Sequence, residues 1–120
     1  MAQSIPPALQ HDLQNFESLR QNHESLLAFK QTIQSELNEI RATLDELKKQ
    51  PDDVVTYKSV GQVMFKVDKV KLVEELDDRE KTLQMKFDST TSQIEKMSKK
   101  LNDLKTKIEL ELSKRELKLQ

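Results

Sequence analysis

The chain has 120 residues, 34% charged and 35% hydrophobic, with one Gly, three Pro and no Cys. Gly and Pro are too scarce for a chain that must turn repeatedly to enclose a globular core, and the lack of Cys excludes disulfides and thiolate chemistry. A net charge of -1, from 20 basic and 21 acidic residues, leaves no basic block for a nucleic-acid partner.

The sequence has no apolar run near the roughly 20 residues that span a bilayer. Its start, MAQSIPPALQHD, lacks the basic and apolar regions of a secretory signal. We therefore expect cytoplasmic localisation, with no membrane and no nucleic acid among the partners.

An N-terminal helix is predicted over residues 8–49, where one heptad frame runs without a break. Its seam positions alternate in spacing between three and four, and nine of the twelve are apolar: Leu9, Asp12, Phe16, Leu19, His23, Leu26, Lys30, Ile33, Leu37, Ile40, Leu44 and Leu47. This 3.5-residue repeat predicts a coiled coil rather than a disordered chain. Pro6 and Pro7 suit the start of the helix, and Pro51 ends it.

A β-hairpin is predicted over residues 53–67, in the stretch PDDVVTYKSVGQVMFKVD. Alternation places Val63, Phe65 and Val67 on one face and Gln62, Met64 and Lys66 on the other, which is the periodicity of a strand. Gly61, the single glycine of the chain, lies midway, where a tight reversal needs a permissive backbone.

A C-terminal helix is predicted over residues 69–118, with Asp68 as its N-cap. Nine of its eleven seam positions are apolar: Val73, Leu76, Glu80, Leu83, Phe87, Thr90, Ile94, Met97, Leu101, Leu104 and Ile108. At the α-helical rise the two helices would be roughly 60 and 75 Å long.

The predicted fold is dominated by α-helix: a long antiparallel coiled-coil hairpin with one β-hairpin between its helices, forming a single domain over residues 1–120. Leu37 is expected to face Leu83, and His23 to face Met97. A lone two-stranded hairpin leaves both edges unpaired, so we expect it to join the hairpins of other subunits, closing an oligomeric β-barrel. The residues predicted to mediate this oligomerisation are Val54, Val55, Tyr57, Val60, Gly61, Val63, Phe65 and Val67.

The stretch PDDVVTYKSVGQVMFKVDKVKLVEEL resembles the central segment of the β subunits of archaeal prefoldins, with its Pro-Asp-Asp opening, Tyr-Lys, Val-Gly turn and Lys-rich helix entry. The Ile5-Pro6-Pro7 start is also similar to theirs. The α-type subunits carry a longer insert with two hairpins, whereas this insert has room for one.

The resemblance implies a heterohexamer of two α and four β prefoldin subunits, with a double β-barrel platform and six projecting coiled coils. It also implies that unfolded client proteins are captured at the coiled-coil tips without ATP, protected from aggregation and passed to a group II chaperonin. The sequence agrees on the nucleotide, because it contains no G-x-x-x-x-G-K-[ST] loop.

The heptad frame breaks after Ile108, where leucines leave the seam. Together with apolar residues near the N-terminus they would form an apolar tip, which we predict to bind clients: Ile5, Leu9, Leu13, Leu110, Leu112, Leu117 and Leu119. Fraying of the helix end or packing between tips is the alternative explanation. The alternative function is a structural or adaptor coiled coil that holds no client.

Catalytic and metal sites are not expected. His11 and His23 are twelve residues apart, and no carboxylate motif such as H-E-x-x-H accompanies them. Two paired helices offer no water-poor pocket for a reaction, so we predict no enzymatic activity and no cofactor. His23 is interpreted, with Asp12 and Lys30, as a polar seam residue that loosens the distal coiled coil.

Overall fold

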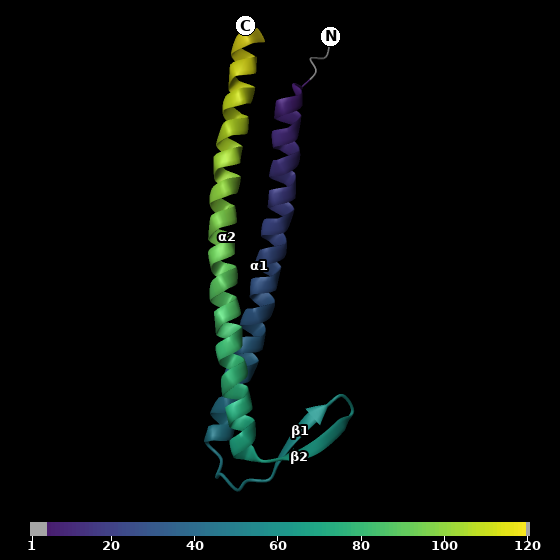
Figure 1. Ribbon diagram of the computed structural model, residues 1–120, viewed down its shortest axis with the longest axis vertical. Helices are drawn as coiled ribbons and strands as arrows, with labels where there is room; N and C mark the ends of the chain where they lie inside the picture. The colour runs from purple at the N-terminus through teal and green to yellow at the C-terminus, as the bar shows by residue number, and fades with distance from the viewer. Residues whose placement is uncertain (1–4, 120) are drawn as a thin grey trace. The chain divides into compact units, whose positions relative to one another are not determined.

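A computed structural model of the chain describes residues 5–119, and the side chains of residues 5–115. Four elements follow one another in the order α1 (Pro7–Lys48), β1 (Thr56–Val60), β2 (Val63–Val67) and α2 (Lys69–Leu119) (Figure 1). β1 and β2 pair antiparallel. The predicted fold of two long helices with one β-hairpin between them is therefore confirmed, whereas the oligomeric β-barrel stays a prediction.

The chain divides into two compact units, which are described separately. We call Lys30–Ser89 the hairpin unit, and Met1–Phe29 with Thr90–Gln120 the terminal unit. The hairpin unit contains both strands and the adjoining parts of both helices. The terminal unit contains the remaining parts of α1 and α2. That the whole chain is a single domain stays a prediction.

The ends of the helices follow from proline and aspartate. The Pro6 carbonyl accepts a hydrogen bond from the Gln10 amide at 3.0 Å, so Pro7 occupies the first helical position, where a missing N–H costs nothing. The Asp68 carbonyl likewise accepts from the Leu72 amide at 3.0 Å, which places Asp68 at the N-cap position of α2.

The core of the hairpin unit is the seam between its two helical parts. Leu37 is 1% exposed and lies in one buried apolar cluster with Leu83, the residue that the heptad register placed opposite it. Fully burying a leucine side chain contributes about 1.5–3 kcal/mol, so this cluster is the main source of stability in the unit. Its members, with the half-buried residues packed against it, are Ile33, Leu37, Ile40, Leu44, Leu83, Val73, Leu76 and Phe87.

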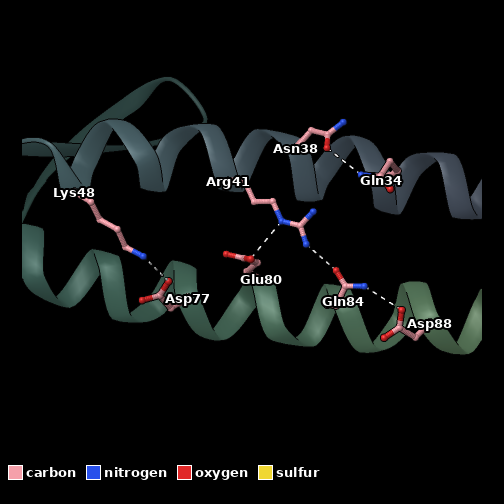
Figure 2. A network of polar contacts seen from close by, with 8 residues as sticks. All are labelled: Gln34, Asn38, Arg41, Lys48, Asp77, Glu80, Gln84 and Asp88. Carbon is pink, nitrogen blue, oxygen red and sulfur yellow. Dashed lines mark hydrogen bonds and ion pairs between the residues drawn. The ribbon is translucent and has the colours of Figure 1, made fainter.

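Polar pairs flank this seam and connect the two helices (Figure 2). Arg41 reaches Glu80 at 3.3 Å and donates to the Gln84 side chain at 2.7 Å. Lys48 lies 3.5 Å from Asp77. Exposed pairs of this kind contribute at most about 1 kcal/mol each, but their spacing helps to specify which residues of the two helices face each other.

The terminal unit has a looser seam. Leu9, Thr90 and Ile108 are buried there, and the remaining seam residues are half-buried. Lys107 of α2 lies 3.3 Å from the Asp12 carboxylate of α1, so the two helices are adjacent within this unit. Asp12 thus has a charged partner at its seam position.

Lys69, the first residue of α2, ties the loop before the hairpin to the helix after it. Its side chain is 7% exposed, although lysine is seldom buried. The Lys69 ammonium donates to the Gln50 carbonyl, just beyond α1, at 3.1 Å and to the Asp52 carboxylate at 3.2 Å. A buried charge is tolerated when it is paired, so these two acceptors explain the burial.

We expect Lys69→Met to loosen the base of the hairpin by about 1–3 kcal/mol, because the substitution leaves the Gln50 carbonyl without this charged donor. The measurement is hydrogen exchange of the amides in residues 50–68 of the purified protein. Lys71→Met is the matched control, since Lys71 is exposed in the same helical turn. Equal exchange in the two variants would contradict a role for Lys69 in holding the loop.

Candidate functional site

The hairpin turns through two residues, Gly61 and Gln62, which lie between the paired Val60 and Val63. Gly61 has a φ of 60°, whereas none of the described non-glycine residues has a positive φ. Glycine with positive φ at the first central position is the pattern of a type II′ turn, whose twist matches that of paired strands. The predicted role of Gly61 in the reversal is thus explained by its backbone.

Both faces of the hairpin expose apolar side chains. The register places Val60, Val63 and Phe65 on one face, and each of them is 54% exposed. On the other face Tyr57 is 54% and Met64 65% exposed. A hairpin with two wet faces and two free edges is at best marginally stable in water, so these surfaces favour a covering partner.

The other residues predicted to mediate oligomerisation lie at the base of the hairpin. Val54 and Val67 are half-buried, and Val55 is exposed. Lys58 of β1 forms an ion pair of 2.8 Å with Glu75 of α2, which holds the hairpin against its own helix. The predicted set therefore lies in the hairpin and in the two residues just before it, where Val54 and Val67 are half-buried and the other side chains are exposed.

Met64 is a surface residue that the sequence analysis missed. Strand alternation assigned it to the face with Gln62 and Lys66, and Met64 was left out of the predicted oligomerisation residues although Tyr57 on the same face was included. The sequence signal that could have identified it was its residue type. A methionine on a solvent-exposed strand adds flexible apolar surface, which adapts to partners of irregular shape.

The leucines predicted to bind clients are only partly exposed. In the terminal unit Leu110 is 57% and Leu112 45% exposed, and Ile5 and Leu13 are exposed as well. Leu9 is 4% exposed, so it belongs to the seam and not to the exposed apolar surface. Leu117 and Leu119 lie in α2, but their side chains fall outside the described residues.

Metal-binding groups and membrane-spanning segments were also sought. Across residues 5–119, no group of three or more His, Cys, Asp or Glu residues could hold a metal ion. In the described part of the chain neither helix is apolar enough to cross a bilayer. His11 is exposed, and His23 is half-buried at its seam position.

Comparison with known proteins identifies relatives along nearly the whole chain. The family model described as Prefoldin subunit matches residues 10–115. Curated proteins named Prefoldin subunit beta include one from Thermococcus gammatolerans, 41% identical over 92% of this chain and 94% of its own length. Another, from Saccharolobus islandicus, is 38% identical over 95% of this chain and 90% of its own length. The crystal structure of the prefoldin beta subunit from Thermococcus strain KS-1 is similar with a TM-score of 0.81 and 37% identity, covering 92% of this chain and 97% of that one.

Replacing both Val63 and Phe65 with Asp is expected to release subunits from any assembly while leaving most of the helix content. The charges would prevent burial of the exposed hairpin face, whereas the helical seam is untouched. Light scattering gives the mass and circular dichroism the helix content. Met85→Asp, on an exposed apolar residue of α2, is the control and should keep the parental mass. A double variant of parental mass would show that the hairpin is not the joint.

Proposed function

Because this chain belongs to the prefoldin family, as a subunit of the β type, we propose that it works in a hexameric chaperone with two α-type subunits and four copies of itself. The complex captures unfolded polypeptides at the coiled-coil tips and prevents their aggregation without ATP. It then delivers them to a group II chaperonin.

The observation that carries this proposal is the contrast between the seam and the end of α2. The seam residues of both helices are buried or half-buried, so contacts within the chain already cover much of their surface. Leu110 and Leu112, just past the last seam residue, keep about half of their surface in water. Exposed apolar side chains that no partner helix covers can bury apolar surface of an unfolded chain, at about 25 cal/mol per Å².

The exposed hairpin supports the assembly part of the proposal. Its apolar residues lie in the hairpin unit, whereas the exposed leucines lie in the terminal unit. The two surfaces therefore have different roles, because the hairpin joins subunits and the terminal unit holds clients. This division favours a chaperone over a structural or adaptor coiled coil, which needs only the first surface.

The assembled complex is expected to suppress aggregation of a denatured client equally well with and without ATP, because the chain contains no phosphate-binding loop. The measurement is light scattering of a chemically denatured client diluted into the purified complex. A non-hydrolysable ATP analogue serves as the control. Suppression that requires ATP in the absence of any other ATPase would contradict the proposal.

Removing residues 110–120 is expected to weaken client holding several-fold while leaving the hexameric mass unchanged, because these residues lie outside the hairpin unit. Removing residues 1–8, which include Ile5, should have a smaller effect of the same kind. The measurement is the aggregation assay on truncated complexes of confirmed mass. A point variant, Leu110→Gln with Leu112→Gln, keeps the length, and Lys105→Gln with Glu109→Gln is its matched control on the exposed helix surface. Full protection by the doubly truncated hexamer would place the holding surface elsewhere.

A further inference from the structure

Methionines carry all the sulfur of this chain, which has four of them and no cysteine. Peroxides oxidise methionine to its sulfoxide, and the change turns a flexible apolar side chain into a polar one. The consequence of that change depends on what surrounds each methionine. Three of the four have described side chains: Met64, Met85 and Met97.

The three described methionines lie in different surroundings. Met97 is a half-buried seam residue of α2, so its own chain covers part of it. Met85 lies in α2 two residues beyond the buried Leu83, and it is 72% exposed. Met64 lies in β2 and is 65% exposed. A peroxide in solution therefore has similar access to Met64 and Met85 in the lone subunit, whereas Met97 is partly shielded.

The hairpin itself gives the Met64 side chain little cover. Met64 pairs with Ser59, whose side chain is short, and the next pair on this face is Tyr57 with Lys66. All three neighbours are exposed, and each carries a hydrogen-bond donor. A sulfoxide oxygen on Met64 would thus have water and donors around it in the lone subunit, so its polarity would not disturb the fold.

The face of the hairpin that holds Met64 is turned away from the subunit's own helix. Lys58 belongs to the opposite face, and its ion pair of 2.8 Å with Glu75 places that face on the side of α2. At the base of the hairpin, the opposite face also carries the buried Thr56. Cover for Met64 must therefore come from another subunit, because α2 lies on the other side.

Oxidation of Met64 would oppose that cover. A thioether is apolar and gains free energy when it is buried, whereas a sulfoxide loses its water and costs free energy unless the partner supplies a donor. The proposed complex contains four copies of this chain, so the cost would recur at each copy. Oxidation of Met85 has no such effect, because this residue lies in α2, outside the hairpin, where a polar group stays in water.

We propose that Met64 is an oxidation site that controls assembly: its sulfoxide, formed in a subunit that has not yet found its partners, prevents the hairpin from joining other subunits. This inference rests on the proposed assembly through the hairpin and adds a chemical control to it. Once the subunits are joined, Met64 is shielded, so the control acts on free subunits and leaves the finished complex intact.

The chemistry is the transfer of one oxygen atom from hydrogen peroxide. A lone pair of the Met64 sulfur attacks one peroxide oxygen, so that an S–O bond forms and the O–O bond breaks. The sulfide is oxidised by two electrons to the sulfoxide, and the departing hydroxide takes the proton of the transferred oxygen and becomes water. Methionine sulfoxide reductases reverse the change, so an oxidised subunit is held back and not lost.

The first test treats the purified full-length chain with hydrogen peroxide, removes the peroxide and then adds an α-type subunit. Light scattering gives the mass of the complex, and mass spectrometry of peptides locates the added oxygen. Oxidation is expected to raise the concentration needed for half-assembly about tenfold or more, because a polar group would have to be buried in each copy. Methionine sulfoxide reductase should restore assembly. Unchanged assembly of a chain that is fully oxidised at Met64 would overturn the proposal.

Two variants assign the effect to one sulfur. Met64→Leu keeps an apolar side chain of similar volume, so the treated variant should assemble within about twofold of the untreated one. Met85→Leu is the matched control: it removes a sulfur of similar exposure outside the hairpin, and oxidation should impair it as much as the parent. Circular dichroism confirms the helix content of both. Loss of assembly in oxidised Met64→Leu would overturn the proposal, since another methionine would then be responsible.

A second measurement needs no variant. Peroxide is added to the free chain and to the complex of confirmed mass, and the oxidation rates of Met64 and Met85 are compared. In the free chain the two rates should agree within about threefold, because the two side chains are similarly exposed. In the complex Met64 should react about tenfold more slowly than Met85, or slower still. Equal rates in the complex would overturn this inference and leave the hexamer standing. An untreated chain that forms no hexamer with an α-type subunit would refute the proposed function, and this inference with it.

Discussion

The structure depends on one geometric constraint: two paired helices can cover only a single stripe of each other. The 3.5-residue apolar repeat supplies that stripe, and each of its positions from Leu9 to Leu47 and from Val73 to Ile108 is buried or half-buried. Among the described residues, most large apolar side chains outside the stripe are exposed. The hairpin and the end of α2 are two places where such residues are close together in the sequence.

The seam is not uniform, and its variation separates the two units. In the hairpin unit a buried cluster around Leu37 is flanked by several polar pairs between the helices. In the terminal unit most seam residues are half-buried, and Asp12, His23 and Thr90 replace apolar residues at three seam positions. Fewer buried apolar contacts mean a lower free energy of local opening. The terminal unit, which carries the exposed Leu110 and Leu112, is therefore expected to open locally more easily than the hairpin unit.

Sequence predicted much of this, because the heptad repeat and the strand alternation act locally. Seam membership followed from spacing alone, and Gly61 was placed in the turn because only a permissive backbone reverses there. Contacts between residues that are far apart in the sequence could not be predicted. Lys69 resembled an ordinary first-turn lysine, yet its burial depends on where the Gln50 carbonyl lies. The sequence placed Leu9 both in the seam and in the predicted apolar tip, and its burial in the structure is that of a seam residue.

The separation of surfaces has a physical consequence for function. A subunit interface formed by the hairpin would need to keep its apolar residues buried permanently. A surface that binds clients would need to bury its apolar residues only transiently. The first need is met by contiguous β-branched and aromatic residues with unpaired strand edges, where backbone hydrogen bonds add to apolar contact. The second is met by isolated leucines on helix edges, where no backbone group is free to bond. Because the two kinds of surface lie in different units, the proposed binding and release of a client would leave the proposed contacts between subunits undisturbed.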